Sequence, residues 1–271
     1  MGDLESIVGN ANLKPEKNIA YEVGIQQEVA PGWGVQATVY YKDIKNLLGQ
    51  EIINTRDKKV YARYINRDYG NVKGIALSLE KLYSDMFAGT IDYTYQVARG
   101  NASDPNSVFS DFQSNPPRES EKQVLPLDWD QQHTFNTTLR IGDPANWNIG
   151  IISRFRTGQP YTPSNPGSAL TTQFENSARK PISHEIDLNA HKMFNLFGQK
   201  VRVFFKVFNL LDRLNEIRVY SSTGTAQKPF RTNAERDILN RNPNFSIGEI
   251  DLRPDFYSEP RRIIIGFNAG F

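Results

Sequence analysis

Apolar and polar residues alternate along most of the chain, and the alternation is clearest at its C-terminal end. From Ile263 the odd positions are Ile, Ile, Phe, Ala and Phe, whereas the even positions from Arg262 are Arg, Ile, Gly, Asn and Gly. Successive side chains of a strand point to opposite faces, so this pattern predicts a β-strand with one apolar face. The same pattern recurs upstream and predicts about nine strands, at residues 18–29, 34–47, 63–82, 87–99, 131–142, 147–158, 182–195, 200–212 and 261–271.

The segments between these strands are of two kinds, which alternate along the chain. Short turns are centred near residues 32, 85, 144 and 198, and long polar connections fill residues 48–62, 100–130, 159–181 and 213–260. Helical periodicity is weak, and we expect one short helix at residues 232–239, inside the last connection. Alternating short turns and long loops are typical of outer-membrane barrels. The pattern therefore predicts an all-β fold, the C-terminal portion of a transmembrane antiparallel β-barrel with its C-terminus in the periplasm.

The overall composition is compatible with such a barrel. Hydrophobic residues make up 38% of the chain and the mean hydropathy is -0.54. A membrane barrel can have such a low hydropathy, because its strands alternate lipid-facing apolar residues with lumen-facing polar ones. The strand number is odd, and the N-terminus has neither the basic nor the apolar region of a signal peptide. We therefore expect the 271 residues to be a single barrel segment that lacks the N-terminal strands of the whole barrel.

Charge and motifs give no indication of an enzyme or a nucleic-acid-binding protein. The chain carries 32 basic and 30 acidic residues, a formal net charge of +2, and no cysteine. It contains no G-x-S-x-G, Walker A or Rossmann motif. The three histidines, His133, His184 and His191, match no zinc-binding spacing. We therefore predict no enzymatic activity, no cofactor, no metal site and no nucleic-acid partner.

Four residues are candidates for contact with a ligand. Arg154 and Arg156 fall on the face assigned to the lumen, where they either contact a plug or a passing substrate or pair with carboxylates such as Glu185. Tyr161 and Tyr220 lie in or beside the long loops, where aromatic side chains either contact a ligand or form part of an interfacial girdle.

Several short motifs resemble those of TonB-dependent outer-membrane receptors. Residues 10–17 followed by Tyr21-Glu22-Val23-Gly24 are similar to the family's "NPNLKPE…YE.G" segment, with Ala11 in place of its proline. Further matches, in the family's order, are Val39–Ile44 with "YYKDI", Asn71–Glu80 with "N.G.…G.E", and Val207–Asp212 with "V.NLFD". Asp128-Trp129-Asp130 resembles the family's "LDWDQRH" stretch, which implies a structural role for this pair of carboxylates.

The resemblance implies a function and a set of partners. The chain would provide the barrel wall and extracellular loops of a receptor that takes up a scarce small-molecule or oligomeric ligand, such as a siderophore, vitamin, oligosaccharide or peptide. Its partners would be outer-membrane lipid, its own plug domain, the TonB complex and the barrel-assembly machinery. The assembly signal would lie in the last strand, on Ile263, Ile265, Phe267 and Phe271.

Two other classes of protein stay open at this level. A small autonomous outer-membrane pore or adhesin would need an even strand number and a signal peptide. A soluble β-sandwich binding module would have Greek-key connections and loops of middling length.

Overall fold

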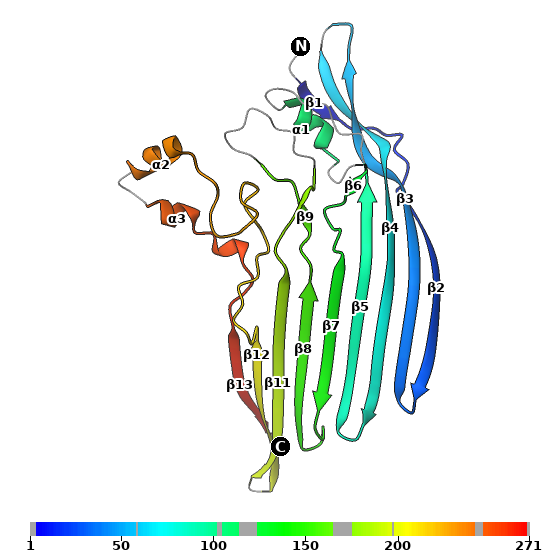
Figure 1. Ribbon diagram of the computed structural model, residues 1–271, viewed down its shortest axis with the longest axis vertical. Helices are drawn as coiled ribbons and strands as arrows, with labels where there is room; N and C mark the ends of the chain where they lie inside the picture. The colour runs from blue at the N-terminus through cyan, green and yellow to red at the C-terminus, as the bar shows by residue number, and fades with distance from the viewer. Residues whose placement is uncertain are drawn as a thin grey trace.

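The computed structural model describes residues 4–57, 59–101, 105–113, 124–164, 175–196, 198–241 and 246–269. Nine long strands of these residues pair antiparallel, each with the next along the chain, in one curved sheet (Figure 1). They are β2 (Lys17–Ala30), β3 (Trp33–Asn54), β4 (Val60–Ser84), β5 (Phe87–Gly100), β7 (His133–Ile141), β8 (Trp147–Arg156), β11 (Ser183–Leu196), β12 (Gln199–Phe208) and β13 (Arg262–Ala269). The nine predicted strands are confirmed, and the single large sheet argues against a β-sandwich.

Short strands and helices lie at one end of this sheet. β1 (Leu4–Val8) pairs parallel with β4, β6 (Leu125–Pro126) pairs with β5, and β9 (Pro160–Tyr161) pairs with β10 (Ala178–Arg179) in a separate ribbon. The helices are α1 (Ser107–Gln113), α2 (Asn233–Asn240), α3 (Ile247–Asp251) and the 3-10 helix η1 (Pro254–Phe256). The predicted helix at 232–239 is therefore confirmed as α2. None of the helices in the described ranges has the length and apolar character needed to cross a membrane.

Tight turns close the opposite end of the sheet (Figure 1). Gly32 follows Pro31 between β2 and β3 with φ 73°, a left-handed conformation that suits glycine. Asp85 and Met86, between β4 and β5, also have positive φ, at 50° and 65°. Two successive residues of positive φ are the mark of a type I′ hairpin turn, which follows the twist of the paired strands. The predicted short turns thus lie together at one end.

The strand register aligns apolar side chains into continuous rows on one face of the sheet. One row joins Val23 of β2 to Val39 of β3 and Ile75 of β4. Because every strand pairs in register with the next, the same face continues to Ile265 of β13. Val23 is 79% exposed and Ile265 is 71% exposed. An apolar surface of this extent indicates contact with lipid.

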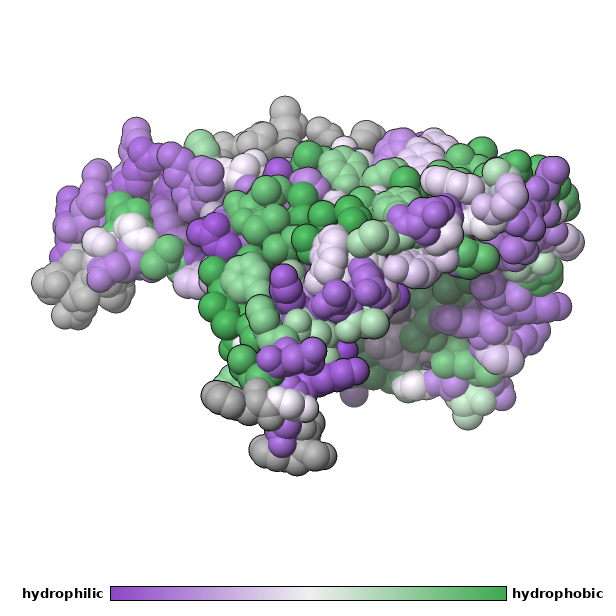
Figure 2. Space-filling model, turned by 90° about the horizontal axis from the view of Figure 1, so that it is seen from below, coloured by the Kyte–Doolittle hydropathy of each residue, from purple (hydrophilic) through white to green (hydrophobic). Residues whose placement is uncertain are grey.

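The other face of the sheet is polar and lines its concave side. One row joins Asp92 of β5, Asn136 of β7, Arg154 of β8 and Glu185 of β11. Seen from the turn end, the sheet is an arched band around a hollow (Figure 2). Aromatic rings cover glycines on this face: a Cβ at Gly266 would lie 2.5 Å from Cζ of Phe204.

The predicted long loop at residues 48–62 is wrong. β3 and β4 continue through it as a paired hairpin, from Leu47 opposite Asp68 to Asn54 opposite Val60. This hairpin extension begins after a register shift at Ile44 to Leu48 and passes beyond the last residue of β5, Gly100. At about 3.3 Å per residue a 22-residue strand spans roughly 70 Å, far more than the ~25 Å apolar band of a barrel. The extension therefore projects beyond the lipid-facing part of the sheet.

A buried carboxyl group lies at the base of the hairpin extension. Asp68 is only 6% exposed, and Asn101 donates a hydrogen bond of 2.8 Å to its Oδ1. Burial raises the pKa of Asp68 above its usual range, and the Asn101 hydrogen bond and the Arg67 charge offset part of this rise. The ionised form is thus less stable in the folded hairpin than in the unfolded chain.

The assignment of the two faces predicts the effect of a charge on each. Val39→Arg puts a guanidinium on the apolar face, which costs about 2–4 kcal/mol near the middle of a bilayer. Gln36→Arg is its matched control, because Gln36 lies on the polar face of the same strand and is exposed. We expect Val39→Arg to lower the unfolding free energy in phospholipid vesicles and Gln36→Arg to leave it nearly unchanged. Equal tolerance of both variants would contradict the facing.

The raised pKa of Asp68 predicts a pH dependence. Because the native state retains the proton to higher pH than the unfolded chain, stability falls as pH rises from the ordinary carboxyl pKa through the raised one. Asp68→Asn should remove this decrease and stabilise the protein at neutral pH, since Asn accepts the same hydrogen bond. Denaturant unfolding between pH 3 and pH 8 measures the effect. Asp57→Asn, at the exposed hairpin tip, should not change the pH profile.

Candidate functional site

Arg154 lies in the polar wall and is held by carboxylates of β11. Its Nη1 is 2.9 Å from Oδ2 of Asp187 and 3.6 Å from Oε2 of Glu185. Asp187 also accepts a hydrogen bond of 3.0 Å from the backbone N–H of Asn209, where β12 ends. This arrangement matches the charge-pairing alternative for Arg154. Its guanidinium fixes the wall at the loop end of β8, β11 and β12.

Arg156 lies two residues further towards the loops and is exposed. It has no ion-pair or hydrogen-bond partner within the part of the chain that the structure describes. It borders a cleft of about 350 Å³, the loop-base cleft, between the loop ends of β8 and β11 and the connection after β12. Polar side chains dominate its lining, among them Gln131, Lys180, Ser183, Glu185, Asn215 and Glu216. A free guanidinium in a polar cleft is suited to bind a carboxylate or another planar oxyanion.

Asn215 connects this cleft to the barrel wall. The residue is 6% exposed, its Oδ1 accepts from the backbone N–H of His184 at 2.9 Å, and its Nδ2 donates to the His184 carbonyl at 3.0 Å. Glu216 accepts from the backbone N–H of Ala226 at 2.5 Å. Polar loops carry no periodicity that would have marked Lys180, Asn215 or Glu216 as neighbours of Arg156, and the sequence prediction missed them.

Tyr161 and Tyr220 belong to one contact between two loops. The backbone N–H of Ser164 donates to the carbonyl of Ser221 at 2.9 Å. Gly224, at φ 71° in the turn that follows Tyr220, lies against the Tyr161 hydroxyl so closely that a Cβ there would overlap it. The structure therefore brings the two predicted tyrosines together, about a loop junction and apart from the paired Arg154.

Tyr220 is engaged inside its own loop. Its hydroxyl donates to the carbonyl of Asp251 at 3.1 Å, and its ring centroid lies 4.9 Å from that of Phe256. Partial burial raises the pKa of the Tyr220 hydroxyl. Hydrogen bonds from Arg253, which also lies over Phe256, lower the pKa of Asp255. These contacts hold the Tyr220 side chain within its own loop.

A buried carboxylate fastens the other loops to the sheet. Asp130 is 1% exposed and accepts from the backbone N–H of Ala98 at 2.7 Å and from the guanidinium of Arg179 in β10. Arg179 also donates to the carbonyls of Asp130 and Gly158, at 2.9 and 3.2 Å. Asp128 accepts from Nδ2 of Asn176 at 2.7 Å. The structural role predicted for this carboxylate pair is supported, although the segment is irregular and not a strand.

The polar face of the sheet is electrically asymmetric. Outside the hairpin extension, β2 to β5 present four carboxylates and one cation on this face, whereas on β7 to β13 cations outnumber carboxylates. The first set is Glu22, Glu28, Glu80, Asp92 and Lys42; the second is Arg140, Arg154, Arg156, Lys200, Arg202, Lys206 and Arg262 with Glu185 and Asp187. Arg202 and Lys206 line a shallow hollow of about 270 Å³ that holds no carboxylate among the described residues. Arg156 therefore lies on the basic side.

The three histidines have local partners on the sheet. His133 is 2.9 Å from the Tyr93 hydroxyl, His184 is 3.3 Å from Ser153 Oγ, and His191 is 3.4 Å from the Pro144 carbonyl. Among the described residues, no three His, Asp or Glu side chains gather into a metal-binding group.

The predicted assembly residues of the last strand lie along the sheet edge. Ile263, Ile265 and Phe267 pair with Val207, Phe205 and Val203 of β12 and are exposed on the apolar face. Phe271 lies outside the described residues. The outer edge of β13 has no partner strand in the described chain, so it is available to close a barrel.

Comparison with protein families gives a clear match. A family model described as TonB dependent receptor-like, beta-barrel matches residues 1–210. No curated protein matches the chain.

The chain is also similar in fold to solved outer-membrane proteins. It superimposes on the outer-membrane transporter YddB of Escherichia coli with a TM-score of 0.58 and 12% identity, over 80% of this chain and 31% of that one. On the ferric-catecholate import receptor Fiu of Escherichia coli it superimposes with a TM-score of 0.54 and 14% identity, over 96% of this chain and 29% of that one. On FpvA of Pseudomonas aeruginosa bound to pyoverdines the TM-score is 0.56 and the identity 12%, over 94% of this chain and 27% of that one. The chain thus spans about a third or less of each of these proteins.

Proposed function

Because the chain belongs to the TonB-dependent receptor β-barrel family, we propose that it provides the barrel wall and ligand-capturing loops of an outer-membrane receptor. The complete receptor would take up a scarce ligand from outside a Gram-negative cell and release it into the periplasm. The family is one of receptors and transporters, not of enzymes. The apolar face of the sheet supports the membrane placement, since nothing else in the described chain covers it.

The proposed orientation follows the length of the connections. The tight turns and the C-terminus lie in the periplasm, and the connections that carry α1 to α3 lie outside the cell. Such an arrangement exposes the loop-base cleft to the external medium. The polar face then encloses a plug domain, which in turn interacts with the TonB complex. The barrel-assembly machinery recognises β13.

The proposed class of ligand rests on the guanidinium of Arg156 at the base of the loops, which has no ion-pair partner among the described residues. A cation that the wall carboxylates leave unpaired favours a ligand with negative charge. The basic side of the lumen extends this preference along the path inward. Among the structural neighbours, Fiu imports a ferric catecholate and FpvA binds pyoverdine. We therefore propose an anionic ferric siderophore as the ligand of this receptor.

The role of Arg156 predicts a loss of affinity on its removal. In the intact receptor, Arg156→Ala should weaken binding of a ferric catecholate chelate about tenfold to a hundredfold, the usual value of a charge-assisted hydrogen bond. Fluorescence titration of the purified receptor measures it. Arg156→Lys should retain part of the affinity. Arg140→Ala, an exposed cation at the turn end of the same face, is the matched control and should bind as the wild type does.

Uptake of iron by cells separates this function from a passive pore. Collapse of the proton-motive force should stop uptake through an energised receptor and leave diffusion through a pore unaffected. Binding that does not respond to Arg156→Ala would contradict the site. Uptake that persists without the proton-motive force would contradict the receptor function itself.

A further inference from the structure

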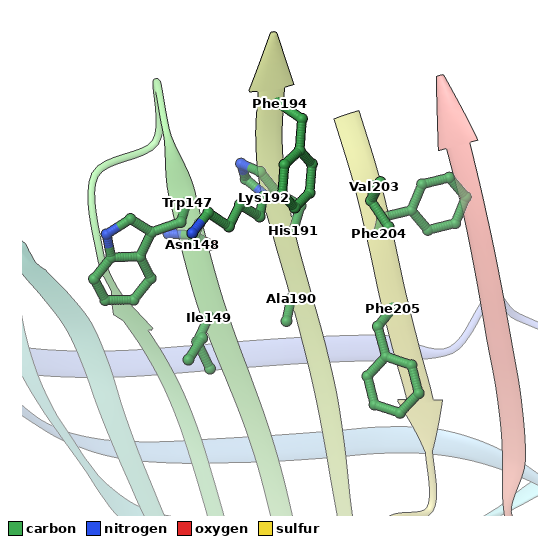
Figure 3. Close-up of a pocket in the computed structure, with 10 residues that line it drawn as sticks. All are labelled: Trp147, Asn148, Ile149, Ala190, His191, Lys192, Phe194, Val203, Phe204 and Phe205. Carbon is green, nitrogen blue, oxygen red and sulfur yellow. The ribbon is translucent and has the colours of Figure 1, made fainter. Parts of the chain in front are cut away.

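A groove of about 490 Å³ opens on the apolar face of the sheet, close to the tight turns. Its lining comes from β8, β11 and β12 and includes Trp147, Ile149, Ala190, Lys192, Phe194 and Phe205. Trp147, Phe194 and Phe205 stand around the short side chain of Ala190 (Figure 3). Its volume falls within the range of small-molecule binding pockets, roughly 300–1,000 Å³.

The groove exists because one small residue interrupts a row of large ones. The row runs through Ile141, Ile149, Ala190, Phe205 and Ile265, from β7 to β13. Only Ala190 in this row has a side chain of a single carbon. A hollow therefore remains between Ile149 and Phe205, with apolar walls on both sides (Figure 3). Such a slot has the shape and polarity of a site for a hydrocarbon chain.

Polar groups gather at the turn end of the groove. Lys192 faces the same side as Trp147 and Val203, its register partners, and Nζ lies 5.7 Å from the centroid of the Phe194 ring. No carboxylate pairs with Lys192 among the described residues. A lysine on a lipid-facing surface extends its ammonium to the level of the headgroups. Trp147 adds an indole N–H, an arrangement typical of membrane interfaces.

We propose that this groove binds one anionic phospholipid, with an acyl chain over Ala190 and the phosphate at Lys192 and Trp147. The unpaired ammonium selects the anionic headgroup, and the apolar slot holds the chain. The proposal rests on the membrane placement proposed above but is independent of the transported ligand. A bound lipid would fill the gap between β8 and β12 and brace the wall beside the last strands.

Native mass spectrometry of the intact receptor tests this proposal. The receptor is exchanged from vesicles of phosphatidylglycerol and phosphatidylcholine into detergent, and retained lipid is counted. We expect one phosphatidylglycerol per receptor, retained in preference to phosphatidylcholine. Lys192→Gln should reduce that preference about fivefold, the usual effect of one cation near an anionic lipid surface. Ala190→Leu should fill the slot and abolish retention of both lipids.

Two control variants make the outcome specific. Ala37→Leu enlarges another alanine of the apolar face, between Ile25 and Leu77, and should retain the lipid. Lys206→Gln removes a cation from the opposite face and should not change the preference. Equal retention by Ala190→Leu and Ala37→Leu, an unchanged preference in Lys192→Gln, or a receptor dimer without lipid would each overturn the proposal. Ligand binding by every variant is measured in parallel, so loss of the receptor function is seen separately.

Discussion

The backbone hydrogen-bond ladder between neighbouring strands is the interaction on which the rest of this structure depends. In hydrocarbon no water can satisfy an N–H or a carbonyl, so each strand must find its partners in the strands beside it. The ladder fixes the register, and the register fixes which side chains share a face because the side-chain period is two. A slip of one residue between β3 and β4 would move Val39 and Ile75 to opposite faces. The apolar surface and the charged wall are therefore one consequence of the same pairing.

Most of the sheet was predictable from the sequence because the membrane-facing strands obey this alternation. The hairpin extension was missed for the opposite reason: its buried positions beyond Ile44 include polar residues such as Gln50 and Asp68, at 0% and 6% exposure, so they give no apolar period. Its contacts join residues distant in the sequence, such as the hydrogen bond of 2.9 Å from Gln50 to Asn106, and periodicity does not reveal them. The helix α3 was also missed, although Ser246 and Glu249, which form a capping box in the structure, have the spacing of a helix start in the sequence.

The candidate site was predictable only in part. Alternation assigns Arg154 and Arg156 to the same face but does not distinguish them, because they differ in what lies across the sheet. The pairing of β8 with β11 sets Glu185 opposite Arg154 and Ser183 opposite Arg156, so within the described chain only the guanidinium of Arg154 has carboxylate partners. Tyr220 shows the converse case, since a loop aromatic that suggested ligand contact is held by Asp251 and Phe256. Partners distant in sequence decide the role of each residue.

The two faces of the sheet also differ in where they carry charged residues. On the apolar face a charge is tolerated only at the margin, and Lys192 lies close to the tight turns at that margin. On the polar face charges lie at every depth, and their sign changes between β5 and β7. In a channel bounded by low-dielectric walls such a division produces a field across the lumen. In the proposed receptor that field would direct negative charge towards β8 and β12, where Arg156, Arg202 and Lys206 have no ion-pair partner among the described residues.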